Sequence, residues 1–332
     1  MQEFTGYEYI KIAIANAYGL DKLTWEERID WVDGIVSRNQ NLITYATDAK
    51  EPMQFIKAVN ALRDAEQSIP TGYIMGLDAT ASGLQVMAAL IGCHKTAANV
   101  NLIDTGSRED VYTKVASEMN QICSTDIDRS MIKDPVMCTF YGSKAEPKNL
   151  LGEGEELTAF YEILGKELTG AMEVMEDIQS CWQKDALKHE FTLPDGHTAS
   201  VKVMVPIDKK ITVDELNGAT FTHRVYVNQA QEFGISLAAH ITHSIDAYMV
   251  REMYRRAYNQ GFEILTVHDC FFASPNHMQK VRENYRDILV DITESNMLEN
   301  ILRQITGNPN LEYVKHTNTL GELIKESEYC LS

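Results

Sequence analysis

Residues 264–273 read ILTVHDCFFA, an apolar run with His268 and Asp269 at its centre. We interpret this run as a β-hairpin. A carboxylate within such a segment is costly unless it is paired or bound to a metal ion, although a turn that exposes Asp269 would also account for it. A second apolar run, Tyr73–Leu77, is interpreted as a strand that ends in Asp78. An aspartate there, just before a helix, is also typical of an N-cap.

Around these two runs the pattern predicts an α+β fold, in which a few strands carry acidic tips and many helices surround them. Apolar residues recur at helical spacing in most of the chain. Turn residues Pro194-Asp195-Gly196 separate alternating segments and predict a hairpin within 191–206, with further β character at 225–227. An irregular tail closes the chain. The segments expected to be helical are 6–68, 83–91, 108–187, 231–258 and a single long amphipathic helix over 277–305.

Two strand-borne carboxylates brought together suit a pair of Mg²⁺ ions about 3.5–4 Å apart, because magnesium prefers hard oxygen ligands and few protein carboxylates. A third pattern supports this chemistry. Arg129, Lys133, Met137 and Tyr141 are spaced four apart, so they share one face of a helix. Arg and Lys can clamp a triphosphate while Met and Tyr lie against a base and sugar. The alternative is a solvated charge pair beside a core Met and Tyr.

Composition restricts the remaining possibilities. The chain has 332 residues and a net charge of −18, which argues against general nucleic-acid binding unless cations gather at one site or a partner supplies them. No apolar run approaches the roughly 20 residues that a membrane helix needs, and we expect no secretory signal in MQEFTGYEYIK. Six cysteines without a C-x-x-C pair argue against a zinc site or a disulfide scaffold and suit a reducing cytoplasm.

The order D-x3-SG-x-Q from Asp78, R-x3-K-x7-YG-SK from Arg129, and the pair His268-Asp269 resembles motifs A, B and C of the single-subunit phage and mitochondrial RNA polymerases. The resemblance extends from about residue 72 to residue 332. It includes further segments that match the family: 99–102, 110–112, the Pro-Asp-Gly hairpin at 194–196, His243-Ser244-x-Asp246, and the tail from Leu320 through Glu326-Ser327.

The resemblance implies a role for each matching residue. It makes Asp78 and Asp269 the ligands of two Mg²⁺ ions. It makes Arg129 and Lys133 ligands of the incoming triphosphate. The same resemblance places Met137, Tyr141, Gly142 and Gly83 at the base and sugar, His243 at the ribose 2′-hydroxyl, and His268 beside the primer end.

Three departures accompany the resemblance. Asp134-Pro135 falls inside the motif B stripe, where proline should kink or segment the helix near Met131. Ala-Glu-Pro follows Ser143-Lys144 in place of an aromatic-glycine stretch. Family members are far longer, and neither a complete thumb, nor an N-terminal promoter domain, nor the D/T-x-x-G-R motif is found here. The chain is therefore similar to the larger subunit of a split, two-subunit podovirus RNA polymerase.

The implied organisation is a polymerase palm, with a small antiparallel sheet, and mainly helical fingers. Residues 1–70 would be a helical segment and partner interface, 71–104 the first part of the palm, 105–258 the fingers, and 259–332 the second part of the palm with the tail. Implied partners are a DNA template, an RNA product, NTPs and a smaller second subunit, with a single-stranded-DNA-binding protein as a further candidate. The implied compartment is the cytoplasm of an infected bacterium, without membrane attachment.

Two rival functions remain at this stage. A DNA polymerase of the A family shares the R-x3-K helix and the His-Asp hairpin. However, that class has Glu where Gly83 stands, Glu where Cys270 follows Asp269, and an aromatic where Met137 stands, so all three positions favour ribonucleotides. A non-catalytic scaffold subunit is the other rival, and the retained charges argue against it because buried charge without metal or substrate is unfavourable.

Overall fold

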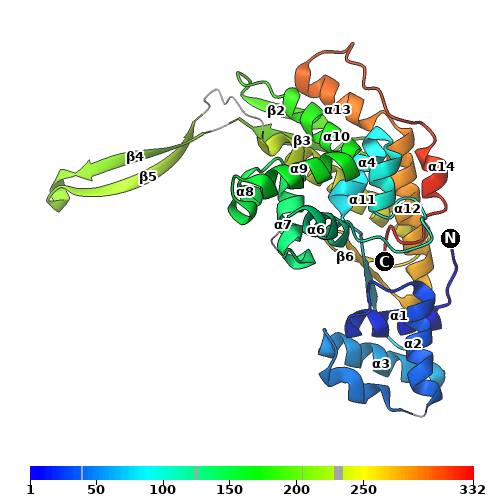
Figure 1. Cartoon of the computed structure of the whole chain (residues 1–332). Coiled ribbons are helices and arrows are strands. Elements are labelled where there is room, and N and C mark those ends of the chain that lie inside the picture. Colours follow the sequence, from blue (N-terminus) through cyan, green and yellow to red (C-terminus); the bar gives the residue numbers. More distant parts are fainter. Residues whose placement is uncertain (39, 124–125, 204, 228–234) are drawn as a thin grey trace.

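The computed structural model describes the whole chain except residues 39, 124–125, 204 and 228–234. It is an α+β structure, mostly helical with small antiparallel sheets, as expected (Figure 1). The helices are α1 (Gly6–Tyr18), α2 (Trp25–Ser37), η1 (Leu42–Thr47), α3 (Pro52–Glu66), α4 (Ser82–Ile91), α5 (His94–Asn99), α6 (Val111–Ile122), α7 (Arg129–Phe140), α8 (Ala145–Leu151), α9 (Glu155–Glu167), α10 (Thr169–Ser180), η2 (Asp214–Leu216), α11 (Ile235–Asn259), η3 (Pro275–His277), α12 (Met278–Glu294), α13 (Met297–Thr306) and α14 (Leu320–Ile324). The strands are β1 (Met75–Asp78), β2 (Lys188–Thr192), β3 (Thr198–Lys202), β4 (Val205–Val213), β5 (Ala219–Val227), β6 (Leu265–Val267) and β7 (Cys270–Ala273).

The central sheet has the strand order β1-β7-β6, with both pairs antiparallel. Strands β6 and β7 form the expected hairpin, and His268 and Asp269 are the two residues of its turn. His268 has a φ of 54°, a left-handed conformation that a tight two-residue turn requires. Because β1 pairs with β7 so that Asp78 faces Cys270, the end of β1 lies beside this turn.

The N-terminal helices α1 to α3 pack as a group on one side of the sheet (Figure 1). Thr5 and Thr24 each form a capping box with a glutamate three residues later, which satisfies the first amides of α1 and α2. Trp25, fully buried, stacks on Tyr329 with ring centroids 5.4 Å apart. The expected helical character of 6–68 is confirmed, and this segment is joined to the C-terminal end of the chain.

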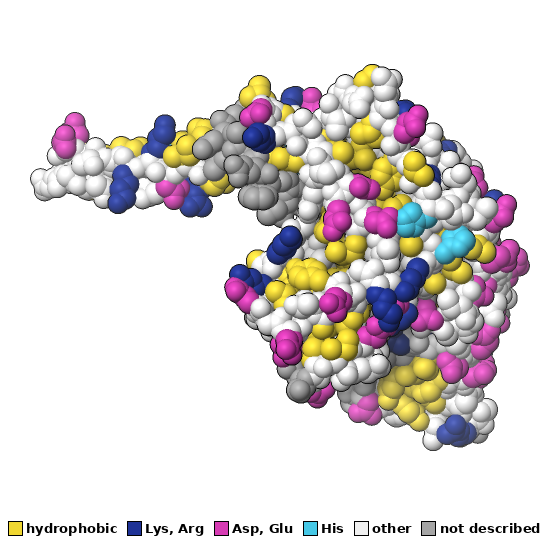
Figure 2. All heavy atoms as spheres, turned by 45° about the horizontal axis from the view of Figure 1, so that its top comes forward, with side chains coloured by type: hydrophobic (Ala, Val, Ile, Leu, Met, Phe, Trp, Pro, Cys, Tyr) yellow, Lys and Arg dark blue, Asp and Glu magenta, His cyan; other side chains and the backbone are white. Residues whose placement is uncertain are grey.

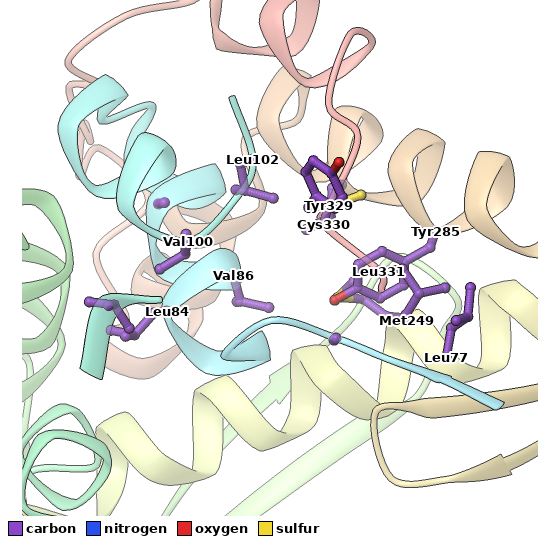
Figure 3. Packing of buried hydrophobic residues seen from close by; sticks show 14 of the residues in the cluster. Leu77, Leu84, Val86, Val100, Leu102, Met249, Tyr285, Tyr329, Cys330 and Leu331 are labelled. Carbon is purple, nitrogen blue, oxygen red and sulfur yellow. The ribbon is translucent and has the colours of Figure 1, made fainter. Parts of the chain in front are cut away.

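The tail is irregular as expected, apart from one short helix, but its last residues are buried in the body of the protein. Residues 320–324 form α14, and Leu331 forms an antiparallel bridge with Ala79 beside β1. Buried Gln85 donates from Nε2 to the carbonyl oxygens of Val100 and Cys330, both at 2.9 Å. Figure 3 shows Tyr329, Cys330 and Leu331 packed among buried residues of α4, α11, α12 and β1. The sequence does not reveal this because the contacts join residues about 250 positions apart.

Two expectations need correction. The amphipathic stretch 277–305 is two helices, α12 and α13, because Ser295 turns to an extended backbone with ψ at 165°. Helix α7 is not segmented at Pro135 but runs unbroken from Arg129 to Phe140. The hydroxyl of Thr139 donates to the carbonyl oxygen of Pro135 at 2.8 Å, within the same turn. The expected helix 231–258 is confirmed as α11 from Ile235 onward, and residues 231–234 of that expectation lie outside the described part of the chain.

A long antiparallel hairpin, β4–β5, projects from the body (Figure 1). Only residues 225–227 of β5 and the start of β4 were expected to have β character. The side chains of the arm are mostly exposed on both faces, and Ile211, Phe221 and Tyr226 are among the exposed apolar ones. The sequence does alternate here: apolar Ile207, Ile211 and Val213 are separated by polar residues along β4, a two-residue period that the sequence analysis did not use. The shorter hairpin β2–β3 around Pro194-Asp195-Gly196 is confirmed.

Candidate active site

Asp78 and Asp269 lie side by side at one end of the central sheet. The amide of Ala79 donates to the carbonyl oxygen of Asp269 at 3.2 Å, which links the residue after Asp78 directly to the β6–β7 turn. Asp78 is not an N-cap, because α4 begins after Ala81, whose φ is 56° and whose side chain makes no capping bond. Asp269 lies in a turn, as the alternative reading had it, but it is half-buried rather than free in solvent.

The two carboxylates repel each other in a poorly solvated recess. Burial, reinforced by the charge of Asp269, raises the pKa of Asp78 to about 6, against the amide of Ala79 and the positive charge of Lys133. The Asp78 side chain is open to the recess, yet protein surrounds it and removes much of its hydration. A third acid on α11, Asp246, has its pKa raised to about 7 by burial and then by Asp269, against a hydrogen bond from Ser82.

These acids line a cleft of about 1040 Å³. The structure brings nearly all the expected site residues to its wall: Asp78, Gly83, Arg129, Lys133, Met137, Tyr141, His243, His268 and Asp269. Gly142 is the exception and does not line the cleft. Its φ of 88° explains the glycine there, because it follows the last turn of α7 in a left-handed conformation.

The two cations of α7 differ in their surroundings. Arg129 is held by Asp110, whose Oδ2 lies 2.5 Å from its Nε, and its guanidinium lies over the ring of Tyr112, 5.4 Å from the centroid. Lys133 is exposed toward the cleft, and no ion pair holds it within the part of the chain that the structure describes. Its charge acts on Asp78, which places an unpaired ammonium opposite the acidic end of the sheet.

Tyr141, Gly83 and His243 meet at another part of the wall. The rings of Tyr141 and His243 are 4.8 Å apart between centroids. A Cβ on Gly83 would lie 3.2 Å from the Tyr141 hydroxyl oxygen and 3.4 Å from Cγ2 of the buried Thr242. Burial raises the pKa of Tyr141 to about 12, so its hydroxyl keeps its proton and can donate. Burial also lowers the pKa of His243, followed by repulsion from His240 and His268, which favours a neutral ring.

The cleft also contains cations that the sequence analysis missed. Lys22, from the loop between α1 and α2, pairs with Asp21 at 2.9 Å, and burial and then Arg108 lower its pKa. Arg108 donates to the hydroxyl of Ser332 at 3.0 Å, which brings the last residue of the chain to the cleft. Lys50 lines it too. These positions are isolated charges in the sequence, and only the packing of residues 1–70 against the sheet gathers them. Figure 2 shows basic side chains beside acidic ones on the body of the molecule.

The donor set fits magnesium. One carboxylate lies at the end of β1 and the other in the adjacent β6–β7 turn. Burial and then the charge of Asp269 raise the pKa of Asp78, so a divalent cation would relieve an existing excess of negative charge. The described residues contain no group of three or more His, Cys, Asp or Glu side chains placed to hold a metal. Asp78 and Asp269 would therefore share any ion with water and substrate oxygens, as Mg²⁺ readily accepts.

The amino-acid sequence also matches a known protein family. A family model described as DNA-dependent RNA polymerase matches residues 2–146 and 227–329, which include the cleft-lining residues of both strands and α7. The chain belongs to the DNA-dependent RNA polymerase family. This is a family of nucleotidyltransferases, and the match also covers the N-terminal helices, which the motif resemblance left out.

Individual relatives match at low identity. The DNA-directed RNA polymerase of Pseudomonas phage phiKMV is 27% identical in an alignment of 172 positions, gaps included, that covers 42% of this chain and 21% of the relative. The mitochondrial DNA-directed RNA polymerase 1 of Nicotiana sylvestris is 22% identical in an alignment of 372 positions, gaps included, that covers 93% of this chain and 36% of the relative. The chain thus spans well under half the length of these relatives.

Among solved structures, the POL domain of Pol1 from M. smegmatis, in complex with DNA primer-template and dNTP, overlaps 72% of this polymerase-family chain and 40% of that chain. The TM-score is 0.41 and the identity 17%.

Within the described residues, none of the helices combines the length and the apolarity needed to cross a bilayer.

Proposed function

We propose that this chain carries the nucleotidyl-transfer site of a DNA-directed RNA polymerase, which adds NTPs to an RNA 3′-hydroxyl on a DNA template. One observation carries the proposal: Asp78 and Asp269 lie together at the end of the β1-β7-β6 sheet, and the unpaired Lys133 faces them across the same cleft. Acids on one wall and cations on the other suit a substrate that has both a metal-bound phosphate and a triphosphate tail.

Asp78 and Asp269 would hold two Mg²⁺ ions. When bound, these ions would lower the pKa of the attacking 3′-hydroxyl and neutralise negative charge on the leaving pyrophosphate. Arg129 and Lys133, one helical turn apart on α7, bind the triphosphate, and Lys22 and Arg108 extend the same positive wall. The protein's contribution is to place charge in a recess where water is scarce.

Tyr141, Gly83 and His243 select the sugar. Gly83 has no side chain to collide with a ribose 2′-hydroxyl, and the protonated Tyr141 hydroxyl lies next to it. The ring of His243 lies against that of Tyr141 at an angle of 52°, and Met137 borders the base. His268 sits in the turn beside Asp269, where it orients the primer end. In this reading the central sheet is the palm, and α6 to α11 with the hairpins are the fingers.

The whole-protein activity involves a second, smaller subunit. The net charge of −18 makes this chain a poor ligand for a phosphate polymer outside its cleft. A more basic partner would complete the nucleic-acid channel. The organisation corresponds to the larger subunit of a split phage polymerase in the cytoplasm of an infected bacterium. A single-stranded-DNA-binding protein is a further candidate partner.

The test is primer extension with an RNA primer on a single-stranded DNA template, with Mg²⁺ and either NTPs or dNTPs. Extension with NTPs, much weaker extension with dNTPs, and loss of both on chelation of the metal are expected. Preferential use of dNTPs would favour the A-family-like DNA polymerase instead. Absence of extension with either substrate, in a preparation that includes any co-purifying subunit, would favour the scaffold role.

A further inference from the structure

We propose that Asp110 is a positioning residue that fixes the guanidinium of Arg129 for the triphosphate. This inference rests on the proposed function, since it assigns a role within the same cleft. Arg129 opens α7, whereas Asp110 is the N-cap of α6, so the pair joins two helices at the cleft wall. The Asp110 side chain is 16% exposed and that of Arg129 is 39% exposed, so the bond is partly shielded from water.

The two carboxylate oxygens of Asp110 accept hydrogen bonds from different parts of the protein. Oδ1 accepts from the amides of Tyr112 and Thr113 at 3.1 and 3.3 Å, which caps α6 and fixes the carboxylate relative to the backbone. Oδ2 accepts from Nε of Arg129 at 2.5 Å. The hydrogen bond and the charge of Arg129 are the main influences that offset burial and lower the pKa of Asp110, so the carboxylate stays ionised. The acceptor is therefore rigid as well as charged.

This arrangement decides which nitrogens of Arg129 remain for a ligand. A guanidinium has five N–H donors in a planar fork, and Asp110 takes the one on Nε. No residue that the structure describes accepts from the terminal nitrogens Nη1 and Nη2. The ring of Tyr112, 5.4 Å from the guanidinium carbon, restricts the plane of the group from one side. The outer edge, with its paired terminal nitrogens, is thereby presented to a phosphate in a bidentate geometry.

The electrostatic surroundings add to the importance of this pair. Arg129 lies near Arg108 and Lys22, and each of those two cations has its pKa lowered by burial and by its positive neighbours. Without Asp110, Arg129 would be repelled by these cations and could turn toward solvent. The fixed carboxylate of Asp110 keeps Arg129 in the cleft. Because only one nitrogen of the guanidinium is paired with it, Arg129 can still bind a phosphate.

The decisive variant is Asp110→Asn, because asparagine is as good an N-cap as aspartate but lacks the charge that holds Arg129. Asp110→Ser, which also retains a capping oxygen, serves if the first variant does not fold. The matched control is Asp128→Asn. Asp128 is likewise the N-cap of α7, accepting from the amides of Ser130 and Met131, but no ion pair holds it in the described structure.

The measurement is steady-state extension of an RNA primer on single-stranded DNA, together with inhibition by magnesium tripolyphosphate. We expect Asp110→Asn to raise the KM for NTP and the tripolyphosphate inhibition constant about tenfold, with kcat within about threefold of wild type, as for loss of one partly buried ion pair. In an Arg129→Lys background, Asp110→Asn should add less than about twofold, because lysine lacks the fork that Asp110 orients. The Asp128→Asn control should leave all three constants unchanged.

Equal KM values for wild type and Asp110→Asn, a loss confined to kcat, or full additivity with Arg129→Lys would overturn the positioning role while leaving the polymerase function intact. A wild-type protein that does not extend the primer with NTPs would overturn the proposed function itself, and with it the role of Asp110. The two failures are thus distinguishable.

Discussion

The hydroxyl oxygen of Tyr141 lies 3.2 Å from the point where a Cβ would stand on Gly83. Residue 83 is the second residue of α4, five positions after the end of β1 at Asp78, and Tyr141 follows the last residue of α7. The contact therefore joins the two walls of the cleft at one point. The Tyr141 hydroxyl, a hydrogen-bond donor, therefore lies where a larger side chain at position 83 would block the ribose 2′-hydroxyl.

Tyr141→Phe should relax discrimination between NTPs and dNTPs about tenfold or more while lowering the NTP rate less than about threefold. The reason is that an open Gly83 cannot reject by size, so the choice depends on hydrogen bonds to the 2′-hydroxyl. Competing primer extension with each nucleotide class measures it, with Tyr258→Phe, an 85% exposed residue of α11, as the matched control. Unchanged discrimination in both the Tyr141 variant and a His243→Ala variant would remove this explanation.

Asp78→Asn and Asp269→Asn should each reduce nucleotide addition to below about a hundredth of wild type, because each would remove one of the two carboxylates proposed to hold the ions. Circular dichroism should show a retained fold. Asp30→Asn, at an exposed position of α2, is the control and should keep full activity. A variant of either cleft aspartate that kept more than about a hundredth of the rate would contradict the two-metal assignment.

The same acids should destabilise the metal-free protein at neutral pH. The pKa of Asp78 is raised from 3.8 to about 6 in the folded state, so the folded protein binds a proton that the unfolded chain has already released. Stability should therefore fall as pH rises between these two values and then level off. Because the Asp78 side chain is open to solvent, we discount the shift to about 1 kcal/mol, or about 2 °C in Tm.

In the absence of metal, Asp269→Asn should accordingly raise Tm at pH 7 by about 2 °C and have a smaller effect at pH 4. Mg²⁺ should raise the Tm of the wild type but not that of this variant. Differential scanning fluorimetry at both pH values, with Asp30→Asn alongside, decides the matter. A lower Tm for Asp269→Asn at pH 7 would show that the carboxylate is stabilising rather than strained.

The projecting hairpin should be dispensable for folding. Replacing residues 208–224 with Asn-Gly leaves Ile207 paired with Val225 across a favourable two-residue turn. Since the strands pair with each other and expose most of their side chains, we expect Tm to change by less than about 2 °C. Extension of a primed single-stranded template should also persist. A fall in Tm of more than about 5 °C would mean that the arm packs on the body.

The isolated chain should extend primed single-stranded templates far better than it initiates on duplex DNA. Its net charge is −18, and the cations that the structure gathers, Lys22, Lys50, Arg108, Arg129 and Lys133, lie in one cleft rather than along a channel. Transcription assays on both templates at moderate salt, with and without co-purifying protein, test this. Processive initiation on a promoter-bearing duplex by the chain alone would exclude the need for a second subunit.

The sequence by itself predicted the hairpin around Asp269, the strand that ends in Asp78 and the helical face of Arg129, Lys133 and Tyr141. Each of these is a local pattern, in which alternation or four-residue spacing reports directly on backbone geometry. The proximity of the two aspartates was inferred from motif order. In the structure it follows from the antiparallel register of β1 and β7, which pairs Asp78 with Cys270, the residue after Asp269. Gly142 belongs to the same motif but does not line the cleft, so motif membership alone does not predict which residues reach the site.

Other features were decided by the tertiary structure alone. Lys22, Asp110 and Ser332 belong to segments with no periodic signal linking them, and the packing of the N-terminal helices and the buried tail brings them to one wall. The break between α12 and α13 was missed because the apolar stripe continues past Ser295. The long β4–β5 arm was missed although its residues alternate between apolar and polar, so that failure lay in the interpretation and not in the sequence. Short-range spacing fixes the face that a residue occupies, whereas hydrophobic burial between distant segments determines which faces meet.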